Sequence, residues 1–83
     1  MPRNTERNEK TKAVRTLLAA QRQETEASRE VERRIGSLQR EAQSGRPFSE
    51  ASITALSQAN DKLNKAEAIA GSAIIEFANR WLE

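Results

Sequence analysis

Apolar residues recur three and four positions apart over much of the first half of the chain, the spacing of one face of an α-helix. The column is apolar at both ends and polar in its middle, and Leu18 widens its first turn. This heptad-like pattern predicts a helix over about residues 5 to 43 that packs along another helix. The positions of the column are Val14, Leu17, Gln21, Glu24, Ser28, Val31, Ile35, Leu38 and Ala42.

Residues 44 to 48 predict the loop that ends this helix. Gly45 suits the left-handed conformation just past a helix, and Pro47 disfavours helical geometry in the residue before it. Ser49 is expected to cap a second helix over about residues 49 to 82, with Glu50 placed favourably in its first turn. The small and apolar residues of that helix again alternate three and four apart. They are Ser52, Leu56, Ala59, Leu63, Ala66, Ala70, Ala73 and Phe77.

The N-terminal segment, residues 1 to 12, is almost wholly polar, so nothing in it anchors a helix to a core. We expect this segment to be frayed and to continue into the first helix. Residues 13 to 83 then form a single helical-hairpin domain, because the short loop requires the two helices to run antiparallel.

The most apolar stretch, residues 66 to 82, carries apolar residues on more than one side of its helix, so a single neighbouring helix cannot cover them. A chain of 83 residues without Cys or His must also gain stability by association rather than by disulfides or a metal. We therefore predict an all-α fold, a long antiparallel hairpin of two helices that self-associates into a four-helix bundle or a larger helical oligomer. The oligomer or partner interface is predicted at Ile69, Ile74, Ile75, Phe77, Trp81 and Leu82.

Two residues of this stretch allow more specific expectations. Trp81 either anchors a second subunit or a foreign protein, as Trp does at many interfaces, or caps a core formed by Val14, Leu17 and Leu18. Gly71 weakens the helix and is expected to permit a close approach between helices.

The composition argues against catalysis, because general acid-base and covalent mechanisms most often use His or Cys and both are absent. No cofactor or metal is expected, since the glycines are scattered and no phosphate-binding loop is present. The apolar stretch is too short and too often interrupted by polar residues to span a membrane. The lack of Cys and of an apolar N-terminal segment favours a cytoplasmic location.

A polar interruption of the first helix comprises Gln21, Glu24, Thr25 and Ser28. Three interpretations are open. The residues are exposed to solvent, or they are buried and fix the register of the seam, or they line a ligand cavity opposite the small residues Ala59, Ala66 and Ala70.

Positive charge is concentrated in residues 1 to 46, whereas residues 47 to 83 are net negative. The asymmetry fits either attraction between the two helices or a basic face for a phosphate-bearing partner. Arginines lie along one side of the first helix, where they could bind phosphate or form an ordinary solvated face diluted by Glu26, Glu30 and Glu32. Glu30 is spaced to pair with Arg34. The arginines of this basic row are Arg15, Arg22, Arg29, Arg33 and Arg40.

The segment KLNKAEAIAGSAI, from Lys62 to Ile74, is loosely similar to the second helix of phage helical hairpins that assemble into rings and sequester cyclic oligonucleotides. The similarity consists largely of Ala and Leu spacing, and the chain has no Tyr that could stack on a base. It implies an alternative function, the binding of nucleic acid or a nucleotide, including sequestration of signalling nucleotides, through the basic row.

The residues themselves favour a small non-enzymatic interaction protein, an adaptor, regulator or inhibitor. It would act through a rigid oligomeric helical surface, with itself and another protein as partners.

Overall fold

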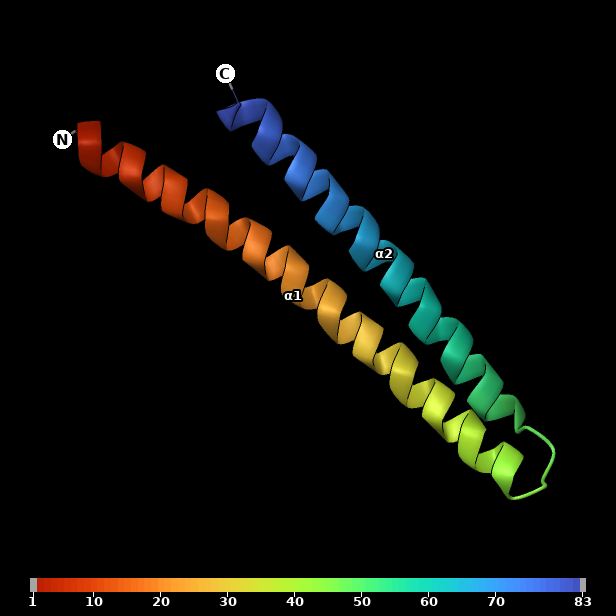
Figure 1. The fold of residues 1–83 in the computed structure, drawn as a ribbon. Helices are drawn as coiled ribbons and strands as arrows, with labels where there is room; N and C mark the ends of the chain where they lie inside the picture. Colours follow the sequence, from red (N-terminus) through yellow and green to blue (C-terminus); the bar gives the residue numbers. More distant parts are fainter. Residues whose placement is uncertain (1, 83) are drawn as a thin grey trace.

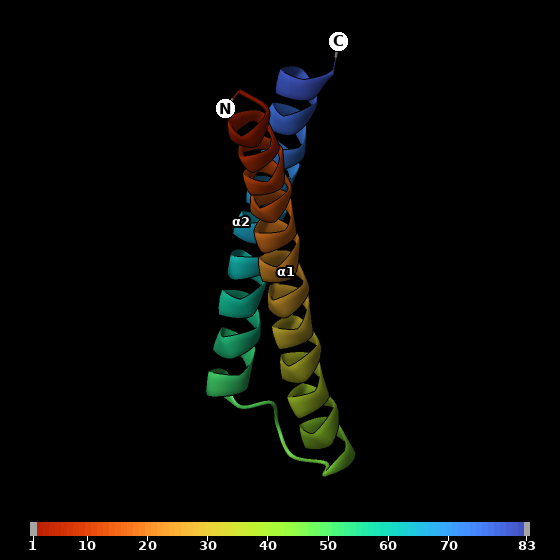
Figure 2. The ribbon, with the colours of Figure 1, turned by 90° about the vertical axis from the view of Figure 1, so that its left-hand side faces the viewer.

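The computed structural model describes residues 2 to 82, with side chains from residue 7 onward, and contains two helices in this range. Helix α1 spans Pro2–Gln43 and α2 spans Glu50–Trp81. They lie side by side and antiparallel, with the loop at one end of the hairpin and both termini at the other (Figures 1 and 2). The predicted all-α hairpin is confirmed.

The hairpin is a rod rather than a compact domain. Its extents are 66 × 18 × 16 Å and its radius of gyration is 19.0 Å, against about 12 Å for a compact domain of this length. A two-helix rod has no third layer, so each helix has one side covered by its neighbour and the remaining sides open.

The observed helix bounds differ slightly from the predicted ones. Helix α1 begins at Pro2 rather than near residue 5, and proline is favourable at the first position of a helix because it donates no backbone hydrogen bond there. Fraying of the polar segment stays a prediction. Helix α2 begins at Glu50, one residue after its cap.

The loop forms as the sequence predicts. Gly45 has a φ of 73°, the left-handed conformation that favours glycine. Its backbone N–H donates to the carbonyl of Ala42 at 3.2 Å, and that of Ser44 donates to the carbonyl of Arg40 at 3.1 Å. At the other side of the loop, the Ser49 hydroxyl accepts a hydrogen bond from the backbone N–H of Ser52 at 3.1 Å and so caps α2.

Glu41 joins the end of α1 to the start of α2. Its Oε1 accepts a hydrogen bond from the backbone N–H of Ser49 at 3.0 Å. This hydrogen bond favours the ionised carboxylate and lowers the pKa of Glu41 below its ordinary value of 4.5. A charge in this position also lies near the positive end of the α2 dipole.

We expect acid to weaken the hairpin partly through Glu41. Because the folded-state pKa is lowered, the stabilisation is present at neutral pH and is lost as pH falls below about 4.5 through the folded pKa. Glu41→Gln should lower the melting temperature at pH 7 and reduce its fall between pH 7 and pH 3, measured by circular dichroism. Glu26→Gln is the control, since Glu26 has no hydrogen-bonding or ionic partner among the described residues. Equal melting curves for the two variants would contradict this role.

The seam of α2 is the predicted one. Every predicted position of that column is buried or half-buried, and the buried residues of α2 are Ala59, Ala66 and Ala70. Small side chains therefore dominate the closest contact with α1. The only other buried residue in the described part of the chain is Ala20 on α1.

The seam of α1 differs from the predicted column at several positions. Leu17, Glu24, Val31 and Leu38 face α2 as predicted and are half-buried. At three alternate positions the preceding residue faces α2 instead, so Ala13, Ala20 and Glu41 replace Val14, Gln21 and Ala42. Ser28 is half-buried together with Ala27, and Ile35 is 51% exposed. Alanine allows two helices to approach closely, and the larger Val14 is left on the flank of the contact, 46% exposed.

Two contacts fix how the helices are aligned. Arg80 Nη2 lies 3.4 Å from Glu9 Oε2 near the open end, and Glu41 contacts Ser49 beside the loop. Residues between these contacts are therefore level with each other in reverse order. Ala20 is level with Ala70, and Glu24 is level with Ala66.

Candidate interaction surfaces

The two sides of the helix contact have different side chains. On one side, Thr16, Glu76 and Arg80 line a groove between the helices. On the other side, Lys10 and Val14 line a groove with Phe77 and Trp81. The rod therefore has two distinguishable broad faces.

The Val14 side carries most of the large apolar side chains that the hairpin leaves exposed. Val14 and Ile35 lie three heptads apart on α1, and Ile53 and Ile74 lie three heptads apart on α2, so each pair shares one side of its helix. This surface is named the apolar face. Its residues are Val14, Leu18, Ile35, Ile53 and Ile74, each at least 46% exposed.

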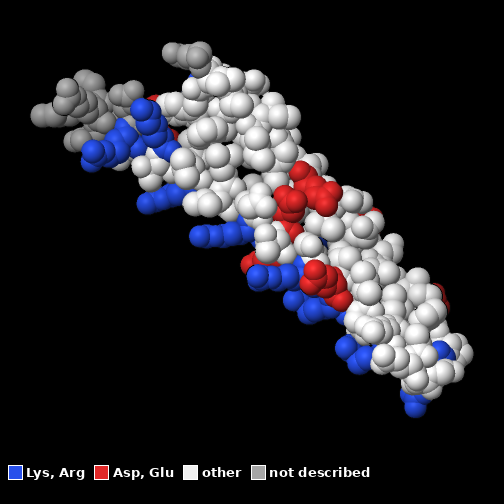
Figure 3. All heavy atoms as spheres, viewed as in Figure 1, with Lys and Arg blue, Asp and Glu red and all other residues white. Residues whose placement is uncertain are grey.

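Acidic residues divide the apolar face near the middle of the rod. Glu32 lies two heptads after Leu18 on α1, and Glu67 lies one heptad before Ile74 on α2. Figure 3 shows acidic side chains in the middle of this face and mostly uncharged residues toward both ends. The uncharged group toward the termini, named the open-end cluster, comprises Val14, Leu18 and Ile74.

The predicted interface residues do not form one surface. Ile74 belongs to the apolar face and is 57% exposed. Ile75 and Leu82 are 61% and 78% exposed, but Ile75 is turned by about 100° from Ile74 and so points away from α1, and Leu82 is the extended residue that caps α2. Ile69 is 54% exposed but lies with Thr16 and Glu76 on the opposite face. Phe77 and Trp81 are half-buried in the contact with α1. The apolar face also carries Val14, Leu18, Ile35 and Ile53, which are not in the predicted set. Their exposure depends on which side of each helix its neighbour covers.

Trp81 closes the open end of the helix contact. Its ring lies 6.4 Å from that of Phe77, with an interplanar angle of 40°, and the guanidinium of Arg80 lies 5.2 Å from its centroid. The residues around Trp81 and Phe77 include Ala13 and Leu17 from α1. This placement matches the expected cap over the core for Leu17 and Val14, but not for Leu18 on the outer flank.

Gly71 does not permit close approach of α1. It is exposed, and a Cβ placed on it would meet no atom within 4 Å. Within the single hairpin Gly71 therefore does not mediate helix approach, and close approach by a helix of another copy stays a prediction. The small residues that let α1 and α2 approach are the alanines of the two seams.

The basic row lies on α1 along the edge of the rod that points away from α2. Figure 3 shows Lys and Arg side chains following this edge, and all five arginines of the row are exposed. Arg15, Arg22 and Arg29 form no hydrogen bond or ion pair with the described residues. The row is thus an exposed line of side chains on α1, and no ion pair among the described residues joins Arg15, Arg22 or Arg29 to the rest of the hairpin.

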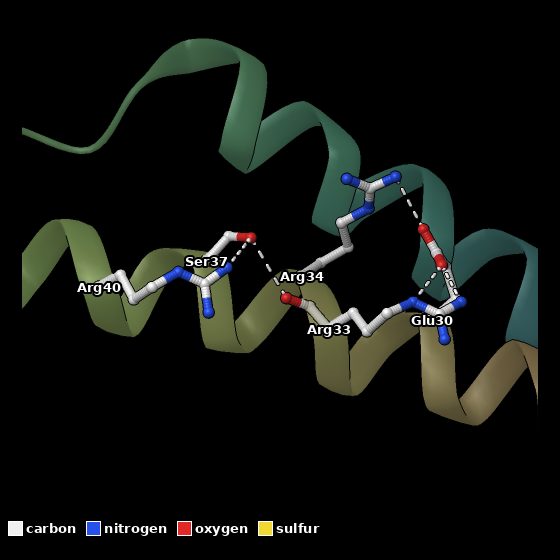
Figure 4. Close-up of polar contacts among 5 residues, drawn as sticks. All are labelled: Glu30, Arg33, Arg34, Ser37 and Arg40. Carbon is white, nitrogen blue, oxygen red and sulfur yellow. Dashed lines mark hydrogen bonds and ion pairs between the residues drawn. The ribbon is translucent and has the colours of Figure 1, made fainter.

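The loop-proximal part of the row is held by neighbouring side chains (Figure 4). Glu30 forms ion pairs with Arg33 and with Arg34, the latter at 2.8 Å, which confirms the predicted pairing with Arg34. Hydrogen bonding by Arg33 is the main reason that the pKa of Glu30 is lowered. Arg40 donates a hydrogen bond to the Ser37 hydroxyl at 3.1 Å.

The polar stretch of α1 encloses no cavity. Gln21 and Thr25 are exposed, and the Thr25 hydroxyl donates to the backbone carbonyl of Gln21 at 3.0 Å. Glu24 and Ser28 are half-buried at the edge of the helix contact. The groove at this level is shallow and lies on the surface of α1, bordered by Leu18, Gln21, Arg22, Thr25, Glu26 and Arg29. Of the three interpretations, solvent exposure holds for Gln21 and Thr25.

Within the described residues, no group of acidic side chains is arranged to hold a metal ion. Neither helix, over its described length, has a segment long and apolar enough to cross a membrane. Comparison with known proteins finds no family model, curated protein or solved structure that matches this chain. Function must therefore be argued from the surfaces themselves.

Proposed function

We propose that this protein is a non-enzymatic interaction protein, an adaptor, regulator or inhibitor, that self-associates through its apolar face and presents a rigid helical surface to another protein. The proposal rests on the sizes of the buried and the exposed apolar side chains: the buried ones are small and many of the exposed ones are large. Among the described residues the four buried ones are all alanines, whereas Ile74, Ile75 and Leu82 are more than half exposed. A hairpin with this distribution gains little stability from its own core.

A second copy of the chain is the occupant that suits the open-end cluster. A two-fold interface brings the same patch from both subunits together, so the patch must be complementary to itself. An uncharged group of Val, Leu and Ile side chains meets this condition, and full burial of one such side chain stabilises by about 1.5 to 3 kcal/mol. Pairing of two hairpins by this cluster gives four helices in contact, the predicted four-helix bundle.

The acidic middle of the apolar face affects how two copies overlap. A complete face-to-face overlap brings Glu32 and Glu67 of one copy near acidic residues of the other, which is unfavourable. Overlap centred on the open-end cluster avoids this repulsion. The smaller group near the loop, which includes Ile35 and Ile53, then remains for a further subunit or for the partner protein.

The mass of the protein in solution tests self-association. Light scattering on a size-exclusion column should give a dimer or a larger multiple of the 9.3 kDa chain. An apolar interface should keep this mass at low and at high salt, because screening weakens charge pairs rather than apolar contacts. A monomer at both salt concentrations would overturn self-association and direct the search to a different protein as the occupant.

The substitution Gly71→Ala tests whether a second copy covers the apolar face beside Gly71. Gly71 lies on the same side of α2 as Ile53 and Ile74, and its surroundings in the single hairpin are open. For an isolated hairpin, Gly71→Ala should stabilise by about 1 kcal/mol through helix propensity. If a second copy packs closely there, the variant should instead melt earlier and dissociate more readily.

Gly36→Ala is the matched control for this substitution. Gly36 lies on α1 beside the basic row, and an added Cβ would meet only the end of the Arg40 side chain, at 3.7 Å. We expect about 1 kcal/mol of stabilisation from this variant whatever the oligomeric state. The comparison is made by thermal unfolding at two protein concentrations.

A further inference from the structure

The basic row is spread along a line. At about 1.5 Å per residue, the distance from Arg15 to Arg40 along α1 is roughly 37 Å. Binding of a small anion requires several donors that point at one place, whereas these guanidinium groups follow one another along an exposed edge. The row therefore matches an extended polyanion better than a nucleotide or an inorganic phosphate.

The three arginines of the row nearest the open end have no ion pair or hydrogen bond with the described residues. Arg33 is paired with Glu30 and Arg40 with Ser37, but Arg15, Arg22 and Arg29 contact no charged or hydrogen-bonding group among the described residues. A guanidinium group in this state can offer two parallel donors to one phosphate. Glu26 lies beside Arg22 and Arg29 and reduces the local positive charge without removing it.

The aromatic side chains lie elsewhere. Phe77 and Trp81 are half-buried between the helices, and Phe48 lies in the loop. Proteins that hold single strands stack the bases on aromatic rings, so the row lacks the means to hold unpaired bases. Its length is close to one turn of a duplex, about 34 to 36 Å.

We propose that the basic row binds the phosphate backbone of double-stranded nucleic acid without reading the base sequence. The row lies at the edge of the rod opposite α2, whereas the apolar face lies on one broad side. The two surfaces meet at Leu18, which borders the same shallow groove as Arg22 and Arg29. The inference does not require self-association, because the row is exposed in the single hairpin. With few phosphate contacts and no base contacts, binding falls in the nonspecific range of about 10⁻⁴ to 10⁻⁶ M at physiological salt.

Fluorescence anisotropy of a labelled duplex DNA of random sequence, titrated with the full chain, tests this assignment. The affinity should fall steeply between about 50 and 200 mM salt because bound counterions are released. Replacing two of the three arginines nearest the open end, in an Arg22→Glu and Arg29→Glu double variant, should weaken binding at least ~tenfold and flatten the salt dependence.

A double variant with the same change of charge on the other helix, Lys62→Glu and Lys65→Glu, is the matched control. These lysines are exposed on α2, away from the row, so the control should retain most of the affinity. Circular dichroism must show equal helicity in the two variants. If the arginine variant loses helicity, Arg22→Gln with Arg29→Gln removes the charges without introducing new ones.

Three results would overturn the assignment. They are absence of duplex binding by the native chain at low salt, equal loss of binding in the arginine and lysine variants, and equal affinity for a single strand or for polyglutamate. The last result would indicate attraction to any polyanion rather than to a duplex backbone.

Discussion

Replacing Ile74 with Asp is expected to convert the assembled protein into monomers. Ile74 is 57% exposed in the single hairpin and belongs to the open-end cluster. In a two-fold interface the substitution acts twice. At about 2 kcal/mol for each buried side chain, the loss is roughly 4 kcal/mol, or about a thousandfold in the dissociation constant. The unpaired carboxylate adds a further cost if the contact still forms.

Ile69→Asp is the matched control for this prediction. Ile69 has the same side chain on the same helix with nearly the same exposure, 54%, but lies on the opposite broad face with Thr16 and Glu76. We expect Ile69→Asp to keep the native mass by light scattering and its helicity by circular dichroism. Any general effect of an Asp in the middle of α2 appears in both variants, so the difference between them reports the interface.

Two outcomes would contradict the proposed interface. If Ile74→Asp keeps the native mass, the open-end cluster is not the contact. If Ile69→Asp dissociates the protein and Ile74→Asp does not, the subunits meet through the Thr16 side of the rod. A parallel Ile35→Asp variant shows whether the contact extends to the loop end of the apolar face.

The loop and the seam of α2 could be predicted from sequence because local chemistry determines them. Gly45 is the residue that adopts a positive φ at low cost, and Ser49 is a good acceptor for the free N–H groups of a helix start. In α2, small and apolar residues coincide in one column, so hydrophobicity and close packing indicate the same face. The predicted and the observed column are therefore the same.

In α1 the prediction placed several seam positions one residue too late, because hydrophobicity and close packing indicate different columns in this helix. Hydrophobicity favours the column of Val14 and Ile35, whereas close approach of the backbones favours the adjacent column of Ala13 and Ala20. The structure takes the alanines, and Ala20 becomes one of the four buried residues. The sequence pattern shows which positions are apolar, but it does not show whether each of them packs against α2 or remains exposed.

That shift explains the apolar face. The column rejected by the intramolecular contact keeps its apolar ends, so Val14 and Ile35 are exposed beside Ile74 and Ile53 of α2. The first helix therefore carries two adjacent seams, one of small residues used within the chain and one of larger residues left over. Under the proposed self-association, the second seam is part of the surface that another subunit covers.

Replacing Ala70 with Leu is expected to disrupt the hairpin itself. Ala70 is only 4% exposed and is level with Ala20 of α1, so the backbones approach closely at this point. Extra methyl and methylene groups there must push the helices apart or adopt strained rotamers, at a cost of about 1 to 3 kcal/mol. For a chain with a core of four alanines, this is a large share of the total stability.

Ala68→Leu is the control for this change. Ala68 is exposed on α2, two residues away, and Leu is nearly as good a helix former as Ala. Urea unfolding followed by circular dichroism should show a lower midpoint for Ala70→Leu and an almost unchanged midpoint for Ala68→Leu. If the midpoints are equal, α1 and α2 do not pack through their alanines. The hairpin would then be open in solution, with its larger apolar side chains free to form the primary core with a second chain.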